Sequence, residues 1–326
     1  MIDRRTFAAA GVALLVALPA TGHAQRAYRV GVLRPGSRPE PDDVQATALP
    51  TALRELGYVE GRNLMLQTRY AENDLQRLPA LARELLDARV EVIVAVGSSA
   101  TRVARQASSS VPIVMFGNFD PIALGLVTDL ARPGGNLTGI LIAPDGTLAG
   151  KRLELLKTLV PQATRVALLA PDDEAAMRLQ IEETRKAAVA LGIALPVVVV
   201  RGRQYERAFE QVVAEKPQAL LVGAHQYFVR DRQPIIALAA KHRLPAMYEW
   251  REQVVDGGLM SYSTSLPELW ARVASHIDRI VKGVPAGDIP IEQPSRFGLV
   301  VNLATLRALG MSLTPAMRLR VDEVIE

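Results

Sequence analysis

Cysteine is absent from the 326 residues of this chain. Its absence excludes disulfides, thiolate metal sites, a cysteine nucleophile and a lipid-modified cysteine. Histidine is also scarce: there are four, and no two stand at a spacing such as His-x3-His that a zinc site uses. Aromatic residues make up only 5% of the chain, whereas 49% is hydrophobic. A chain rich in alanine, leucine and valine but poor in aromatics is typical of helices packed on parallel sheets.

Motifs for cofactor and nucleophile chemistry are missing too. There is no Gly-x4-Gly-Lys-Ser/Thr phosphate loop, no Gly-x-Gly-x-x-Gly after the first predicted strand and no Gly-x-Ser-x-Gly elbow. The net charge is only +4, and the arginines are scattered over predicted helices rather than gathered in one patch. We therefore expect no cofactor, no metal, no nucleic-acid partner and no enzyme activity.

Long apolar runs are confined to the N-terminus, since no later stretch reaches the ~18 apolar residues that span a bilayer. Residues 1–24 have the pattern of a signal peptide: a basic Arg4-Arg5 pair, an apolar run and the small-x-small sequence Gly22-His23-Ala24. The arginine pair followed by Phe7 also indicates a twin-arginine signal, with an ordinary Sec signal as the alternative. We expect a soluble, monomeric mature protein that begins near Gln25 in the periplasm.

One sequence motif occurs twice in the chain. Residues 28–35 read Tyr-Arg-Val-Gly-Val-Leu-Arg-Pro and residues 164–171 read Thr-Arg-Val-Ala-Leu-Leu-Ala-Pro, each followed by a helical stretch and a further apolar run. Continuous apolar runs separated by helix-length segments indicate parallel strands buried on both faces. The repeat therefore predicts an α/β protein of two Rossmann-like lobes with parallel sheets, and a ligand cleft at the carboxyl ends of the strands.

The later part of the chain predicts that the backbone crosses between the lobes three times. We expect lobe one to hold residues 25–143 and 264–292, and lobe two to hold residues 144–263 and 293–326. The amphipathic segment Leu266–Val281 should then form a helix that packs back on lobe one. Three crossings make a three-strand hinge, which suits closure of the two lobes about a ligand.

The loops at the strand ends of lobe one are polar. Ser98 and Ser99 follow the apolar run at residues 90–96 and open a helix, whose free N–H groups and dipole favour a carboxylate. The alternative is that one of them merely caps that helix. Asn118 follows the next strand and should face the cleft, while Asp120 is expected to form a turn before a helix that runs to Leu130.

The matching loops of lobe two carry aromatic rings. His225 and Tyr227 follow one predicted strand, and Tyr248, Glu249 and Trp250 end the next. Aromatic rings at strand ends either cap the core or line a ligand cavity. Glu249 can balance a cationic amine on a ligand, or it can cap the helix that starts at Trp250. We expect all five to bind the ligand together with Ser98, Ser99 and Asn118.

Several longer sequence motifs resemble those of one known family. They are Leu56–Asn63, Asp120–Val127, Arg132–Gly139, Lys151–Leu156, Gly257–Tyr262 and Gln293–Phe297. They are similar to the ABC-transporter substrate-binding family of the tryptophan-binding (TrpX-like) type, which has the type I periplasmic binding protein fold. The resemblance implies a protein that delivers a small organic solute to a permease in the inner membrane. It also implies that Ser98 and Ser99 take the ligand carboxylate, where the tryptophan binders look more like Gly-Thr-Pro.

The sequence thus predicts a periplasmic solute-binding protein that captures a small, carboxylated, amino-acid-like molecule for an ABC permease. Two alternatives stay open at this point. One is an exported hydrolase that uses Ser98 or His225, and the other is a ligand-sensing module for a membrane receptor.

Overall fold

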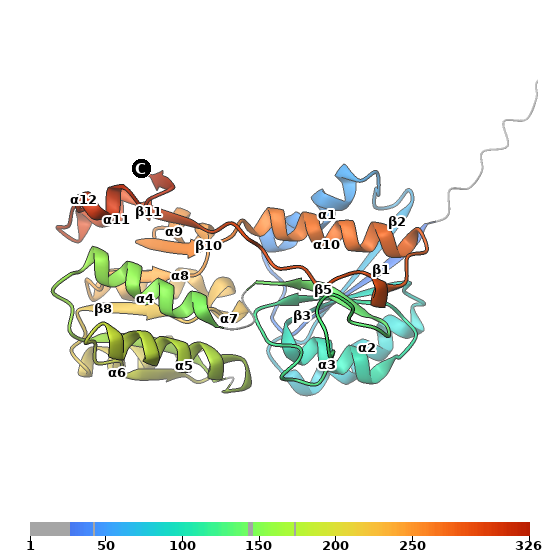
Figure 1. Cartoon of the computed structure of the whole chain (residues 1–326), viewed down its shortest axis with the longest axis horizontal. Helices are drawn as coiled ribbons and strands as arrows, with labels where there is room; N and C mark the ends of the chain where they lie inside the picture. Colours follow the sequence, from blue (N-terminus) through green and yellow to red (C-terminus); the bar gives the residue numbers. More distant parts are fainter. Residues whose placement is uncertain (1–26, 42, 143–145, 173) are drawn as a thin grey trace, which may run out of the picture.

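In a computed structural model of the chain, two α/β lobes stand end to end, and most strands of the two sheets run toward the boundary between them (Figure 1). The structure describes residues 27–41, 43–142, 146–172 and 174–326. The predicted signal peptide and its twin-arginine pair lie outside these residues. The prediction of two lobes with parallel sheets is confirmed.

Lobe one has a five-stranded parallel sheet in the order β2-β1-β3-β4-β5. The strands are β1 (Tyr28–Arg34), β2 (Leu64–Tyr70), β3 (Val92–Val96), β4 (Ile113–Gly117) and β5 (Leu137–Leu141). Helices α1 (Val44–Glu55) and α10 (Leu266–Val281) share an apolar core with one face of this sheet, and α2 (Leu78–Asp87) and α3 (Gly97–Ala107) with the other. Because both faces are covered, β3 and β5 are buried throughout and β1 and β4 over most of their length, as the continuous apolar runs predicted, whereas the edge strand β2 is mostly half-buried.

Lobe two has a seven-stranded sheet in the order β12-β11-β10-β9-β8-β6-β7, in which only the β10–β11 pair is antiparallel. Its strands are β6 (Val166–Pro171), β7 (Val197–Val200), β8 (Ala219–Val222), β9 (Ala246–Tyr248), β10 (Met260–Ser263), β11 (Gly298–Asn302) and β12 (Glu323–Ile325). Its helices are α4 (Thr147–Leu159), α5 (Glu174–Ala190), α6 (Tyr205–Ala214), α7 (Gln226–Arg230), α8 (Arg232–Lys241), α9 (Arg251–Val255), α11 (Leu303–Ala308) and α12 (Pro315–Arg318). Two apolar clusters, one on each face, hold this sheet to its helices.

The chain passes between the lobes between β5 and α4, between β10 and α10, and again before β11 (Figure 1). Helix α10 has the bounds that its sequence predicted, and it packs on α1 and on the sheet of lobe one. Two short 3-10 helices complete the fold, at Leu75–Arg77 and Ala286–Asp288. None of the described helices combines the length and apolar character needed to cross a membrane.

The helix predicted from Pro121 to Leu130 is wrong, because the structure forms successive turns there. The carboxylate of Asp120 accepts hydrogen bonds from the main-chain N–H groups of Ile122 and Ala123, at 2.8 and 3.1 Å. Gly125 then adopts a left-handed conformation with φ of 67°. An aspartate that bonds its own following backbone competes with helix formation, so the favoured turn role of Asp120 is what the structure shows.

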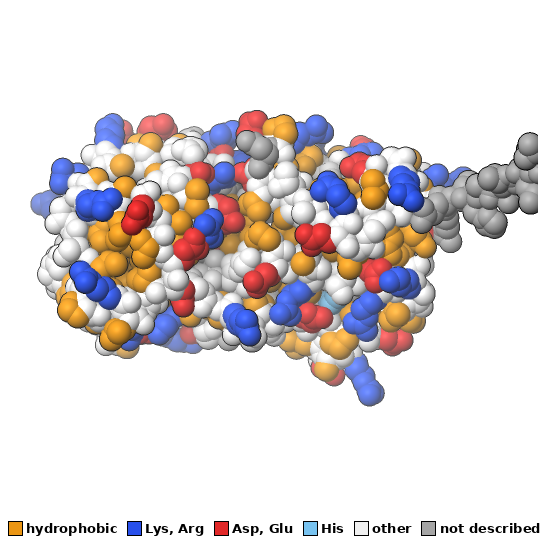
Figure 2. All heavy atoms as spheres, turned by 90° about the horizontal axis from the view of Figure 1, so that it is seen from above, with side chains coloured by type: hydrophobic (Ala, Val, Ile, Leu, Met, Phe, Trp, Pro, Cys, Tyr) orange, Lys and Arg blue, Asp and Glu red, His pale blue; other side chains and the backbone are white. Residues whose placement is uncertain are grey.

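Basic and acidic side chains are interspersed over the face seen from above in Figure 2, with apolar side chains between them. Several arginines elsewhere on the exterior pair with glutamates, as Arg69 does with Glu84 at 2.8 Å and Arg251 with Glu323 at 2.6 Å. Such exposed pairs contribute little to stability, ~0–1 kcal/mol each. The charges that need explanation are therefore the buried ones, among them Arg34, Arg152 and Glu249.

Candidate functional site between the lobes

A cavity lies between the two lobes at the carboxyl ends of their parallel strands. It holds about 790 Å³ of space not filled by atoms, part of which opens to solvent. Residues of both lobes line it, which is the expected position for a ligand of an open parallel sheet. Its lining has three parts: an anion-binding end formed by lobe one, an acidic end formed by lobe two, and aromatic walls to which both lobes contribute.

The anion-binding end is built around the start of α3. Gly97 turns the chain from β3 into the helix with φ of 83°, and Ser98 and Ser99 occupy the first turn and line the cavity. No side-chain hydrogen bond caps α3, so the expected alternative in which one of these serines caps the helix is not what the structure shows. The first N–H groups of α3 therefore remain available to an anion in the cavity.

Arg34 adds a full positive charge to the cavity lining. It is the last residue of β1, is only 8% exposed, and its guanidinium lies 5.0 Å from the centre of the Trp270 ring. Its Nη2 donates a 2.8 Å hydrogen bond to the main-chain carbonyl of Gln45. Burial lowers the pKa of Arg34, while Tyr70 and Asp43 oppose that shift, and an arginine remains charged at neutral pH.

Arg34 was not among the residues that the sequence analysis selected. Its position in the sequence could have indicated it. Arg34 stands just before the proline that closes the first copy of the repeated motif, and Ala170 has that position in the second copy. A charged residue at the end of a strand buried on both faces is a candidate for the cleft edge.

The walls are aromatic, and they come from both lobes. Phe116 and Trp270 of lobe one lie with their ring centres 4.5 Å apart, and Phe119 and Asn118 line the cavity beside them. Trp250 of lobe two is 4% exposed and also lines it. From the sequence, aromatic rings were expected on lobe two alone. Trp270 was missed because it lies in α10, a helix from the later part of the chain that packs on lobe one.

The acidic end of the cavity is Glu249, which directly follows β9 and is 5% exposed. Its carboxylate lies 3.8 Å from Nη2 of Arg152, a buried residue of α4. Burial raises the pKa of Glu249, while the charge of Arg152 and a hydrogen bond from the Trp250 side chain work in the opposite direction. The helix that follows is capped differently: Oε1 of Gln253 accepts from the main-chain N–H of Trp250 at 2.9 Å.

His225 lines the cavity from the start of α7, and its Nδ1 accepts a hydrogen bond from the main-chain N–H of Tyr227 at 3.3 Å. Tyr227 itself does not form part of the lining. Its ring lies edge-on to His225, with centres 4.4 Å apart, and beneath the guanidinium of Arg230. It turns away because α7 begins at Gln226, and consecutive residues of a helix point in different directions.

The structure thus places Ser98, Ser99, Asn118, His225, Glu249 and Trp250 around one cavity. The expectation for Tyr248 is corrected: it is 1% exposed and belongs to the apolar core between the sheet and α6 and α8. Side chains alternate along a strand, so Tyr248 and Glu249 point to opposite sides. The ring of Tyr248 also lies so close to Gly258 that a Cβ there would stand 2.8 Å from it.

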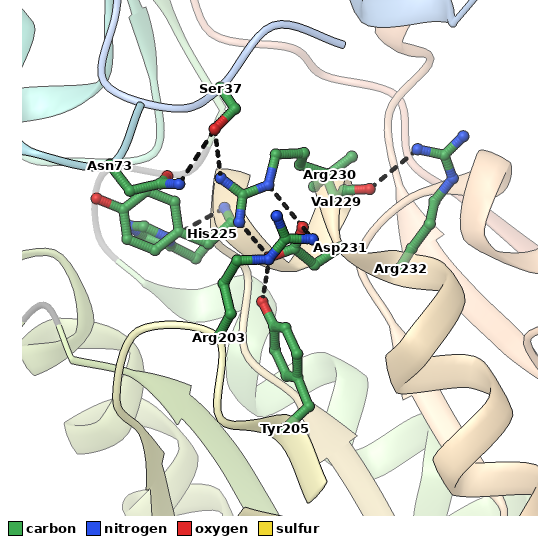
Figure 3. Close-up of polar contacts among 10 residues, drawn as sticks. Ser37, Asn73, Arg203, Tyr205, His225, Val229, Arg230, Asp231 and Arg232 are labelled. Carbon is green, nitrogen blue, oxygen red and sulfur yellow. Dashed lines mark hydrogen bonds and ion pairs between the residues drawn. The ribbon is translucent and has the colours of Figure 1, made fainter. Parts of the chain in front are cut away.

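Polar side chains join the lobes beside the cavity, and we call Ser37, Asp43, Arg230 and Arg232 the interlobe latch. Arg230 donates to the hydroxyl of Ser37 at 3.3 Å (Figure 3). Arg232 pairs with Asp43 at 2.8 Å. Arg230 is held in turn by Asp231, which also pairs with Arg203. These contacts hold the lobes together over the ligand cavity.

The described residues contain no group of three histidine, aspartate or glutamate side chains that could hold a metal ion. The molecule is defined by its two similar lobes, a hinge and a partly open cavity between the lobes with an anion-binding end. These are the features of a two-lobe ligand-binding protein that closes about a small molecule.

Comparison with known proteins gives the family. The model of the ABC transporter substrate binding protein family matches residues 30–325, and the chain belongs to that family. It is therefore a substrate-binding protein and not an enzyme, which sets the hydrolase alternative aside. The resemblance read from the sequence is confirmed.

Individual relatives are distant in sequence but alike in fold. A tyrosine-binding protein of Clostridioides difficile is 25% identical over 263 residues, 80% of this chain and 74% of the relative. A conserved domain protein of Vibrio cholerae is 21% identical with a TM-score of 0.83, covering 92% of this chain and all of that one. A Streptococcus pneumonia protein solved with L-Trp is 22% identical with a TM-score of 0.80, covering 91% and 100%.

Proposed function

We propose that this protein is a periplasmic solute-binding protein that captures a small carboxylated, amino-acid-like molecule between its lobes and delivers it to an ABC permease. The observation that carries the proposal is the pairing of Arg34 with the open start of α3 at one end of an otherwise aromatic cavity. A guanidinium and free helix N–H groups together favour a carboxylate over any neutral group.

The rest of the lining favours a carboxylate that carries an aromatic group. Phe116, Trp250 and Trp270 present ring surfaces to the cavity, and ring stacking is worth ~0.5–1.5 kcal/mol beyond the buried area. The tyrosine-binding relative and the relative solved with L-Trp support the same class of ligand. L-tryptophan and L-tyrosine are therefore the first ligands to test.

Thermal unfolding with a library of carboxylated metabolites tests the proposal. A ligand that binds only the folded protein raises its melting temperature by mass action. We expect L-tryptophan or L-tyrosine to raise it and to remain chemically intact after prolonged incubation. A library in which no carboxylate raises the melting temperature would contradict the proposal, and so would steady consumption of a bound compound.

The serines at the start of α3 provide the first prediction. Replacing Ser98 and Ser99 together with alanine should weaken a carboxylated ligand by ~1–3 kcal/mol, because hydrogen bonds to a charged partner are lost. Isothermal titration calorimetry measures the change. The control is Ser109→Ala, an exposed serine beyond the other end of α3. If the double variant binds as tightly as the parent, the hydroxyls take no part in holding the carboxylate.

The interlobe latch provides the second prediction. Replacing Arg232 with methionine removes its ion pairs with Asp43 and Asp256 and should raise the Kd about fivefold, roughly 1 kcal/mol, because the closed form loses support. Affinity of the parent should also fall with added salt more steeply than affinity of the variant. The control is Arg207→Met, an exposed arginine of α6. An equal salt dependence in both proteins would show that the latch does not support closure.

A further inference from the structure

The acidic end of the cavity is part of a buried ion pair. The side chain of Arg152 is 2% exposed and that of Glu249 is 6% exposed, whereas the members of most other ion pairs in the described residues lie at the surface. Burying two charges is costly, and a buried pair is often no more stable than well-packed apolar residues of the same size. The pair is therefore poorly explained by stability alone.

The geometry of the pair leaves hydrogen-bonding capacity unused. Arg152 donates through Nε to the main-chain carbonyl of Tyr262 at 2.8 Å, but its buried Nη2 has no hydrogen-bond partner. The 3.8 Å between that Nη2 and Glu249 is too long for a hydrogen bond. A carboxylate can accept about four hydrogen bonds, and Arg152 donates none of them to Glu249. Glu249 therefore lines the cavity with capacity to accept hydrogen bonds from a ligand.

The charges around the cavity also balance without a ligand. Arg34, Arg152 and Arg232 are cations, and Glu249, Asp43 and Asp256 are anions, the last two of which pair with Arg232. A ligand with only a carboxylate would leave one uncompensated negative charge in this enclosed space. A zwitterion would add no net charge, and its two ends would face Arg34 and Glu249.

We propose that Arg152, which lies behind the wall and does not line the cavity, sets the ligand class by keeping Glu249 charged, so that lobe two requires a protonated amine. The inference rests on the proposed function, because it assumes that the carboxylate occupies the opposite end. Arg152 is in this view a positioning residue, and Glu249 is the group that contacts the amine.

The other groups that face Glu249 do not replace Arg152. Trp250 donates a neutral hydrogen bond, and Tyr262 of β10 contributes its carbonyl to Arg152 rather than to the carboxylate. His225 lines the cavity from α7, with its Nδ1 accepting from the backbone. Arg34 lies at the lobe-one end and is matched by the ligand carboxylate. Without Arg152, the desolvation that already raises the pKa of Glu249 would no longer be opposed by this cation, so its charged form would be less favoured.

The test compares three probes with one carbon skeleton: L-tryptophan, indole-3-lactate and indole-3-propionate, which carry an ammonium, a hydroxyl and neither. Calorimetry on the whole protein gives the ratio of the Kd for indole-3-lactate to that for L-tryptophan. We expect this ratio to be at least tenfold in the parent at pH 7 and within about twofold in Glu249→Gln. The same ratio in both proteins would overturn the inference, because Glu249 would then not recognise the amine.

The role of Arg152 has its own readout, the pH profile of the same ratio between pH 6 and 8.5. In Arg152→Met the preference for the ammonium should be weaker at the acid end of this range and should increase with pH as Glu249 ionises, more steeply than in the parent. Arg152→Lys, which keeps the charge, should retain most of the preference and serves if the methionine variant does not fold. A level profile in a folded Arg152→Met would overturn the role of Arg152. If none of the three probes binds the parent, the aromatic ligand class of the proposed function fails, whereas binding of the probes with equal ratios in the parent and Glu249→Gln overturns this inference alone.

Discussion

Replacing Arg34 with methionine is expected to weaken binding of L-tryptophan by about 2–5 kcal/mol, the largest effect on affinity that we predict for one substitution. The guanidinium is 8% exposed, so a ligand carboxylate beside it is shielded from water and has lost its hydration. Methionine keeps much of the volume over the Trp270 ring but leaves the carboxylate without its cation. Calorimetric titration of both proteins measures the difference.

Two controls separate lost charge from damaged structure in this experiment. Arg29→Met changes an exposed arginine of the same strand and should leave the affinity unchanged. L-tryptophanamide lacks the carboxylate, so Arg34→Met should bind it no more weakly than the parent does. If Arg34→Met weakens the binding of L-tryptophanamide as much as that of L-tryptophan, Arg34 shapes the cavity instead of binding a carboxylate.

Replacing Arg152 with methionine should lower the free energy of unfolding by about 3–5 kcal/mol at neutral pH, because it strands the buried carboxylate of Glu249 without a partner. Urea denaturation measures this loss. The matched variant Arg152→Met with Glu249→Leu removes both charges and should regain most of the stability. If the double variant is no more stable than the single one, the cost arises from packing around α4 and not from the unpaired charge.

The loss of unfolding free energy in Arg152→Met should also depend on pH. Burial raises the pKa of Glu249 in the folded state, and loss of Arg152 removes the charge that opposes this shift. A group whose folded pKa exceeds its unfolded value of ~4.3 stabilises the fold at low pH and stops doing so as pH rises through the folded pKa. The deficit of Arg152→Met should therefore be smallest near pH 4 and grow toward pH 8.

The fold was accessible from the sequence because its signals are local. The repeated motif at residues 28–35 and 164–171 became β1 and β6, the strands from which the two sheets are built outward. Helix α10 has the bounds that the sequence predicted, because its amphipathic pattern is local to the segment Leu266–Val281. The predicted helix after Pro121 failed because Asp120 and Gly125 fold that segment into turns.

The candidate site was only partly accessible, because it depends on directions that one sequence does not supply. Position at a strand end selected Glu249 and Ser98, which line the cavity, but also Tyr248, which points the other way. Arg152 lies in the middle of α4, where an arginine usually faces solvent, and the packing of α4 on α5 and on strands β8, β9 and β10 buries it. Contacts between residues far apart in the chain are what completed the site.

Helix α10 has a consequence for the order in which this molecule can be assembled. The helix covers one face of the first sheet and brings Leu266 and Trp270 to the cavity, yet it is encoded after nearly all of lobe two. A growing chain that has not reached residue 281 therefore holds a lobe-one sheet on which α1 is the only helix that covers this apolar face among the described residues. Lobe two needs β11 and β12 from still later residues. Neither half can be completed before the other has been made, so ligand-binding competence arises only at the end of synthesis.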